Sequence, residues 1–155
     1  MSITFTIYGE PKGQPRPKAF SRGGHARVYD PGTAEGWKSL IAHAVTPHIP
    51  AVPIEGPIRV DWTAYFPRPK RLMRRSDPEG AVMHTAKPDR DNVEKALLDA
   101  LTQIGMWRDD AQVCDGRSRK FYAEKNGRPR MEVTISEATQ WPADLRDRQT
   151  PVGGE

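Results

Sequence analysis

Cysteine is almost absent from this sequence. Cys114 is the single cysteine in 155 residues, so the chain cannot close a disulfide bond on itself and lacks the thiols of a zinc cluster. Because stable disulfide bonds belong to oxidising compartments, their absence favours a reducing, cytoplasmic setting. We expect Cys114 to be a small buried hydrophobic residue rather than a reactive thiol.

Long apolar segments are also missing. No apolar run approaches the roughly 20 residues that cross a membrane. The segment Met1–Tyr8 has neither the charged start nor the continuous apolar stretch of a signal peptide. We therefore expect a soluble, intracellular protein with no membrane partner. There is no glycine-rich nucleotide loop, zinc-ligand pattern or nucleophilic serine motif either, so we expect no nucleotide cofactor.

The charges that are present are mildly basic in sum and unevenly distributed. The chain has 24 Lys and Arg against 20 Asp and Glu, and its pI is about 9.4, which fits a polyanionic partner. Two short stretches hold many of the cations, and phosphate contacts are expected there, although a solvated linker is an alternative for the second stretch. The first contains Lys12, Arg16, Lys18, Arg22 and Arg27, and the second contains Arg68, Lys70, Arg71, Arg74 and Arg75.

Hydrophobic periodicity predicts one small α/β domain, a mixed sheet packed with helices, over residues 1–137. Alternating apolar residues predict strands at 3–8, 57–66, 112–124 and 130–136, and apolar stripes predict helices at 33–48 and 91–104. Residues 11–31 and 67–84 lack periodicity, so we expect long loops there, the second of them mobile. Residues 138–155 are polar and contain Pro and Gly, which is typical of a disordered tail.

Two aspartates separated by one residue, Asp89 and Asp91, precede the second predicted helix. Carboxylates with this spacing converge on one cation when the backbone before the helix is extended. Mg²⁺ prefers oxygen ligands and keeps several waters, so two or three aspartates are sufficient protein ligands. The pair is a candidate magnesium site. Aspartates before a helix are also common N-caps, and Asp91 or Asn92 has that alternative role.

Lys95 follows Asp91 by four residues and so lies one turn further along the same helical face. A lysine beside a bound cation stabilises the negative charge that develops on a phosphodiester during hydrolysis. Its alternative is an ordinary ion pair on the helix surface. After the helix, Asp109 and Asp110 form a second acidic pair, which is either part of the same site or a simple turn. The residue patterns alone leave these alternatives open.

Three motifs follow one another between residues 87 and 113. They read Lys-Pro-Asp-Arg-Asp-Asn from Lys87, Lys-Ala-Leu-Leu-Asp-Ala-Leu from Lys95, and Trp-Arg-Asp-Asp-Ala-Gln-Val from Trp107. In this order and spacing they closely resemble the RusA family of Holliday junction resolvases from bacteria and their phages. The resemblance is strong over residues 85–122 and looser over the N-terminal arm, and residues 138–155 lie outside it.

The resemblance implies a homodimeric, bacterial or phage-encoded α/β endonuclease. Members of that family bind four-way DNA junctions and cut two opposed strands with Mg²⁺, with Mn²⁺ as a substitute metal. By position, Asp89, Asp91 and Asp110 correspond to the family's metal-binding carboxylates, and Lys95 corresponds to its catalytic lysine. Lys120 matches a basic position after the acidic pair, where we expect a DNA contact.

Two further residues are candidates for the same site. Asp109 matches an acidic position of the family, and His84 precedes Asp89 by five residues. Asp115 departs from the resemblance, because an apolar residue is expected there. Two other functions are a junction-binding architectural protein that does not cut and a general branched-DNA nuclease. Clustered carboxylates facing a polyanion argue against the pure binder.

Overall fold

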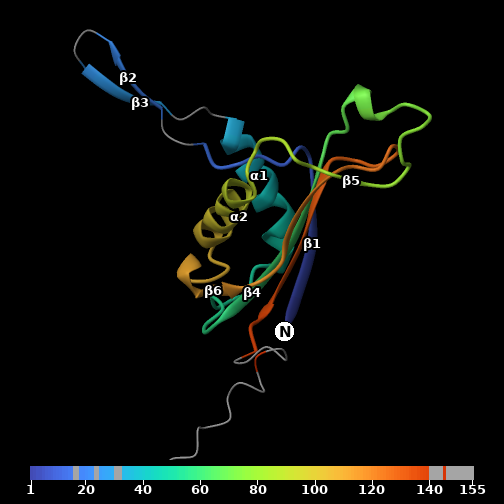
Figure 1. Ribbon diagram of the computed structural model, residues 1–155. Helices are drawn as coiled ribbons and strands as arrows, with labels where there is room; N and C mark the ends of the chain where they lie inside the picture. Colours follow the sequence, from blue (N-terminus) through green and yellow to red (C-terminus); the bar gives the residue numbers. More distant parts are fainter. Residues whose placement is uncertain (16–17, 23–24, 30–32, 140–144, 146–155) are drawn as a thin grey trace, which may run out of the picture.

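The computed structural model describes residues 1–15, 18–22, 25–29, 33–139 and 145. Within them, a six-stranded mixed sheet has the order β1-β8-β4-β7-β5, and β6 also pairs with β4. Its strands are β1 (Ser2–Tyr8), β4 (Ile58–Phe66), β5 (Val82–Met83), β6 (Val113–Asp115), β7 (Ser118–Tyr122) and β8 (Arg130–Glu137). Helices α1 (Thr33–Val45) and α2 (Arg90–Ile104) cover one face of this sheet (Figure 1). The predicted mixed α/β class, a single small domain, is confirmed.

Strand β4 lies at the centre of the sheet and shows why the helices cover one face only. Side chains of a strand alternate between its two faces. On β4, five apolar side chains are buried while the residues between them stay partly exposed. The buried set is Ile58, Val60, Trp62, Ala64 and Phe66. Strand β8 alternates in the same way, so the apolar side chains of both strands pack under the helices. Burying each large apolar side chain contributes about 1.5–3 kcal/mol.

Helix α2 crosses this apolar face and begins and ends close to the predicted limits. Its buried residues recur at helical spacing and are Val93, Ala96, Leu97, Ala100 and Leu101. The helix stops at Gly105, whose φ of 92° is a left-handed conformation that favours glycine. The N-cap position belongs to Asp89, without a side-chain capping hydrogen bond, and Asp91 lies in the first turn. The alternative of Asp91 as the N-cap is therefore wrong.

The other predicted helix and the first and last predicted strands are also confirmed. Helix α1 and the short 3₁₀ helix η1 (Thr46–His48) together fill the predicted range 33–48. Strands β1 and β8 pair antiparallel at the edge of the sheet.

The predicted loop at 11–31 is wrong in its middle. Strands β2 (Lys18–Arg22) and β3 (His25–Tyr29) pair antiparallel there as a separate two-stranded sheet. They project from the body of the domain near the start of α1 (Figure 1). Strands of only five residues carry little apolar alternation in sequence, which is why periodicity missed them.

The predicted strand at 112–124 is divided in two at Gly116. A Cβ atom at Gly116 would lie 1.9 Å from the carbonyl oxygen of Val60, and its φ is 152°, so only glycine fits. The β6 part begins after the short 3₁₀ helix η3 (Asp110–Gln112). Cys114 in β6 is exposed, so its prediction as a buried hydrophobic residue is wrong.

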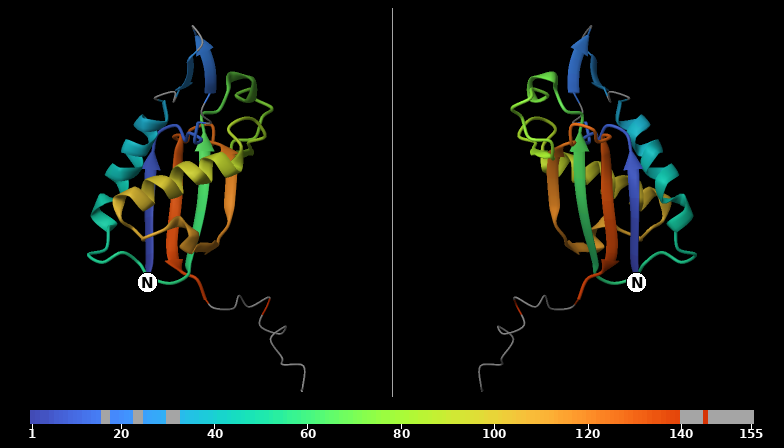
Figure 2. Two further views of the ribbon diagram at one scale, coloured as in Figure 1. Left: turned by 90° about the vertical axis from the view of Figure 1, so that its left-hand side faces the viewer. Right: turned by 90° about the vertical axis from the view of Figure 1, so that its right-hand side faces the viewer.

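Residues 67–84, predicted as a mobile loop, contain the 3₁₀ helix η2 (Lys70–Leu72) and strand β5. The loop and the β2–β3 hairpin lie at the same end of the domain in both views (Figure 2). Most of the predicted tail lies outside the described residues, namely 140–144 and 146–155. Among the helices that the structure describes, none combines the length and apolar character of a membrane span.

Candidate active site

Lys120 of β7 anchors the acidic motif to the sheet. Its ammonium donates hydrogen bonds to the carbonyl oxygens of Ala86, at 2.9 Å, and Pro88, at 2.7 Å. Its own carbonyl oxygen accepts from the backbone N–H of His84 at 3.2 Å. Both ends of the segment 84–88 are therefore held by one residue, immediately before the first aspartate.

The surroundings of Lys120 differ from those of a surface lysine. Partial burial lowers its pKa, and the nearby cations Lys87 and Arg90 act in the same direction, while Asp89 opposes them. We predicted a DNA contact for Lys120 from the sequence. Its two hydrogen bonds give the ammonium an internal, positioning role in this structure, which the sequence did not reveal.

Asp89 lies at the start of α2 and is already next to a cation. The ammonium of Lys87 lies 2.7 and 2.8 Å from its two carboxylate oxygens. The Lys87 side chain is 83% exposed, so water screens this ion pair and its contribution to stability is small. Sequence reasoning missed Lys87, although its spacing of two residues from Asp89 could have indicated it.

Asp91 and Lys95 are exposed on successive turns of α2. Between them, Glu94 accepts a hydrogen bond from the indole N–H of Trp62 at 3.2 Å, which ties this part of the helix to β4. A groove between α2 and β6 continues from Glu94 past Leu98. Because Asp91 and Lys95 are both exposed, the predicted carboxylate and lysine lie together on one accessible stretch of the helix.

Asp109 and Asp110 follow α2 and have different roles. Asp109 is the N-cap of η3, and its carboxylate accepts from the backbone N–H of Ala111 at 2.8 Å. Gln112 completes the turn, since its side-chain oxygen accepts from the backbone N–H of Asp109 at 3.1 Å. The turn alternative thus holds for Asp109. Asp110 is exposed and is the acid of the pair that remains available for a ligand role.

The acidic side chains do not form a closed metal site in this structure. Among the residues that the structure describes, no three His, Cys, Asp or Glu side chains are arranged to hold one metal ion. The strand register gives the reason. Val113, just after η3, pairs with Ile58 at the start of β4, whereas Lys120, which holds Pro88, pairs with Ala64 near its end.

The chemistry of the donors nevertheless suits Mg²⁺. This ion is commonly bound by one or two protein carboxylates and completes its shell with water and phosphate oxygens. Asp89 and Asp91 supply carboxylates at the start of α2, where Asp89 is partly buried and Asp91 is exposed. Asp110 would have to approach them to act as a third ligand.

The N-terminal arm is attached directly to the acidic motif. The backbone N–H of Gln14 donates to the carbonyl oxygen of Asn92 at 2.8 Å. A Cβ atom at Gly13 would lie 2.9 Å from Cβ of Pro88 and 3.2 Å from Cβ of Asn92, so glycine permits this close approach. The base of the basic arm therefore packs beside the first turn of α2.

The predicted phosphate contacts divide into three groups. Lys12 forms an ion pair with Glu10 at 3.3 Å. Arg16 lies outside the described residues, as do the side chains of the hairpin residues Lys18, Arg22 and Arg27. Among the predicted contacts in the loop at 67–81, Arg68 is partly buried. The other four are exposed, namely Lys70, Arg71, Arg74 and Arg75.

His84 is buried and lines a pocket together with Arg90 and Lys120. Its ring stacks on Phe66 with centroids 4.0 Å apart and meets the edge of Tyr122 at 4.7 Å. Its Nδ1 atom is buried without a hydrogen-bond partner. Burial lowers the pKa of His84, and the charge of Lys120 adds to the effect.

Asp115, the residue that departs from the resemblance, is explained by a neighbour across the sheet. The guanidinium of Arg59 donates to its carboxylate at 2.8 Å and also forms two hydrogen bonds with Asp61. These hydrogen bonds raise the pKa of Arg59. An acid at this position is therefore a partner for an arginine on the uncovered face.

Comparison with known proteins identifies relatives over most of the chain. Residues 8–136 match the model of the family described as Endodeoxyribonuclease RusA. An uncharacterized protein of Bacillus subtilis, YqaN, is 37% identical over 142 residues, which cover 88% of this chain and 97% of that protein.

Two relatives bear a functional name over a shorter match. The crossover junction endodeoxyribonuclease RusA of Escherichia coli K12 is 53% identical over 49 residues, which cover 32% of this chain and 39% of that protein. The enzyme of the same name from Enterobacteria phage 82 matches to the same extent. Because the family match spans most of the domain, this chain belongs to the RusA family of endodeoxyribonucleases.

Proposed function

We propose that this chain resolves Holliday junctions by Mg²⁺-dependent, paired cleavage of two opposed strands, in DNA recombination and repair. The observation that carries the proposal is the arrangement at the start of α2. Asp89 lies at the N-cap, and Asp91 and Lys95 are exposed on successive turns of the helix. A carboxylate pair beside a lysine suits a bound cation and a phosphodiester together.

Each residue has a defined part in this proposal. Asp89 and Asp91 would hold Mg²⁺, with Asp110 as a third ligand, and Mn²⁺ would substitute. When bound, the ion polarises the phosphate and lowers the pKa of a bound water. Lys95 would stabilise the charge on the non-bridging oxygens. Lys120 would keep Asp89 in place through the carbonyl oxygens of the preceding segment.

We further propose that the chain acts as a homodimer in the cytoplasm. Two opposed strands require two active sites, which a twofold axis supplies with one kind of chain. The exposed cations of the 67–81 loop and the arm beside Asn92 would contact the arms of the junction. Phosphate contacts of this kind position DNA without reading its sequence.

The test is a cleavage assay on a synthetic four-way junction with flap and linear duplex controls. We expect cleavage with Mg²⁺ or Mn²⁺ and none with EDTA. Asp89→Asn, Asp91→Asn and Asp110→Asn should abolish cleavage and retain binding, since each removes a ligand and no basic surface. Glu35→Gln, on the exposed first turn of α1, is the matched control. A ligand variant that cuts at the wild-type rate would remove that residue from the site.

The same assay separates the other functions. A wild-type protein that binds the junction and never cuts it would be an architectural protein. Equal cleavage of flaps and junctions would indicate a general branched-DNA nuclease. Paired cleavage is tested on a cruciform plasmid, where two cuts within one binding event give linear product directly. Accumulation of nicked plasmid before linear plasmid would contradict the dimeric mechanism.

A further inference from the structure

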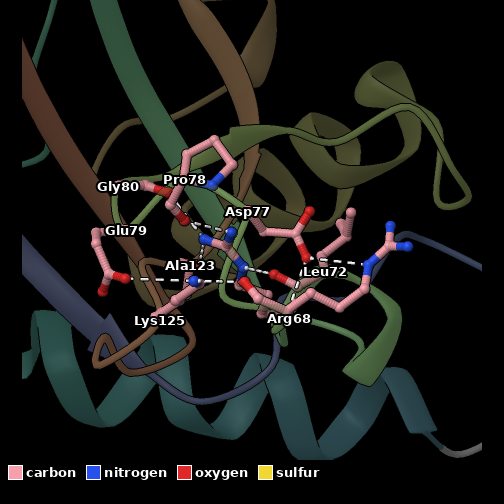
Figure 3. A network of polar contacts seen from close by, with 9 residues as sticks. Arg68, Leu72, Asp77, Pro78, Glu79, Gly80, Ala123 and Lys125 are labelled. Atoms are coloured by element: carbon pink, nitrogen blue, oxygen red, sulfur yellow. Dashed lines mark hydrogen bonds and ion pairs between the residues drawn. The ribbon is translucent and has the colours of Figure 1, made fainter.

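Arg68 lies directly after β4 and points into the loop that follows. Its Nε donates to the carbonyl oxygen of Leu72 at 2.8 Å, and Nη1 donates to Gly80 at 2.8 Å and to Ala123 at 3.5 Å. Nη2 donates to the carbonyl oxygen of Pro78 (Figure 3). The whole guanidinium is thus occupied by backbone oxygens from both sides of the loop.

Lys125, between β7 and β8, is a second internal cation that contacts the same loop. Its ammonium donates to the carbonyl oxygen of Arg74 at 2.7 Å and lies 3.3 Å from a carboxylate oxygen of Glu79 (Figure 3). The Lys125 side chain is only 10% exposed, whereas Glu79 is 79% exposed, so water screens the ion pair and the hydrogen bond to Arg74 is the main internal contact. Its backbone N–H also donates to the carbonyl oxygen of Glu79 at 3.0 Å.

These two cations supplement a small apolar contact, since Leu72 is the loop residue that packs against the hydrophobic core. No residue between 67 and 81 is fully buried. Arg68 and Lys125 supply hydrogen-bond donors to backbone carbonyl groups on both sides of the loop, which tie its segments together. Asp77 adds a local turn, since its carboxylate accepts from the backbone N–H of Arg74 at 2.8 Å. The loop is therefore folded before any partner binds.

The outer surface of the folded loop is cationic. Lys70, Arg71, Arg74 and Arg75 are exposed, and the Arg74 side chain is 72% exposed. The Asp77 side chain is only 14% exposed, and its carboxylate forms an ion pair with Nε of Arg74 at 3.5 Å. The loop stands at the same end of the domain as the β2–β3 hairpin (Figures 1 and 2).

We propose that Arg68 and Lys125 are positioning residues that fix the 67–81 loop as a preformed phosphate-binding surface for a duplex arm of the substrate. The inference rests on the proposed function for the identity of the partner. Lys70, Arg71, Arg74 and Arg75 make the contacts with the DNA backbone. Arg68, grouped with them by sequence, supports the surface from inside. Ordering the loop in advance removes part of the entropic cost of binding.

The experiment compares Arg68→Lys with Arg75→Gln. Lysine keeps the charge of Arg68 but cannot reach all four carbonyl oxygens. In DNA-free protein, Arg68→Lys should speed amide hydrogen exchange at Leu72, Met73, Asp77 and Lys125, whose N–H groups bond within this network. Arg75→Gln should leave exchange unchanged. Lys125→Gln is a second variant for the internal role, and thermal unfolding verifies that each variant is folded.

Binding to a four-way junction in EDTA gives the second readout and requires no cleavage. Arg68→Lys should weaken binding about tenfold, the size expected when a binding surface loses its preorganisation. Arg75→Gln should reduce the slope of log K against log salt by about 0.9, the loss of one phosphate contact. Arg108→Gln, an arginine that is also 72% exposed, is the matched control with no effect on either readout.

The outcomes separate this inference from the function on which it rests. Wild-type exchange in Arg68→Lys, or faster exchange with unchanged affinity, would overturn the positioning role. Weaker binding with unchanged exchange would make Arg68 a direct contact with the DNA and would also overturn it. Failure of the wild-type protein to bind any DNA would reject the proposed function itself. Failure to cleave, with binding intact, would leave the inference standing.

Discussion

The basic loop at 67–81 and the acidic segment at 87–95 are close in the sequence and use their charges differently. In the loop, Arg68 is occupied by backbone carbonyl oxygens inside the fold. In the acidic segment, Asp91 and Lys95 point to solvent. The same residue types, Arg, Lys and Asp, therefore occur both in structural and in functional roles. The difference is whether the fold satisfies the group internally, because a buried charge without partners costs several kcal/mol.

The largest effect is expected at Lys95, one of the exposed charges of the acidic segment. We expect Lys95→Ala to lower the rate of junction cleavage about 10²- to 10³-fold, as for the loss of one group that stabilises transition-state charge. The free energy of unfolding should change by less than about 0.5 kcal/mol, since the side chain is exposed. Cleavage rate and urea unfolding are the measurements. Lys38→Ala on α1 is the control, and equal cleavage by both variants would assign Lys95 to the helix surface.

Lys120 should behave as an internal charge. Lys120→Met removes two charge-assisted hydrogen bonds and leaves the carbonyl oxygens of Ala86 and Pro88 without a donor. We expect a loss of about 1–3 kcal/mol in the free energy of unfolding, together with slower cleavage through the displaced Asp89. Lys120→Arg should recover much of the free energy of unfolding and much of the cleavage rate. A variant with normal stability and a reduced salt slope of DNA binding would instead identify a phosphate contact.

His84 predicts a pH dependence of stability. Its pKa in the folded protein lies below the ordinary value of 6.5, because of burial and the charge of Lys120. The unfolded chain therefore binds more protons, and stability should fall as pH drops below about 6.5, by at most about 1.4 kcal/mol per pH unit. Denaturant unfolding between pH 7.5 and 5 measures this slope. His84→Phe keeps the stacking and should flatten it, whereas His43→Gln on α1 should not.

The smallest effect is expected at Asp115. Its ion pair with Arg59 has both side chains about one third exposed, at 34% and 38%, so solvent screens it. Asp115→Asn should lower the free energy of unfolding by less than about 1 kcal/mol and leave cleavage unchanged. The contrast with Asp110→Asn separates the two acids that lie five residues apart. Loss of cleavage in Asp115→Asn would contradict its assignment as a structural partner.

The amino-acid sequence was sufficient for the parts of this protein that follow from local pattern. Alternating apolar residues predicted β4, and the stripe from Val93 to Leu101 predicted α2, because burial on one face imposes a fixed period. The motif order also carried the family assignment and placed Asp89, Asp91 and Lys95 around one helix start. The β2–β3 hairpin and the break at Gly116 gave no such periodic signal.

Only the tertiary structure decided which charges are internal. Arg68 and Arg75 look alike in the sequence, but Leu72, Gly80 and Ala123 surround one of them with carbonyl oxygens. The hydrogen bonds of Lys120 to the carbonyl oxygens of Ala86 and Pro88 likewise have no signal in the sequence, which predicted a DNA contact for this residue. These partners are brought together by chain segments up to 55 residues apart. A charge acquires its role from such neighbours, and local sequence does not encode them.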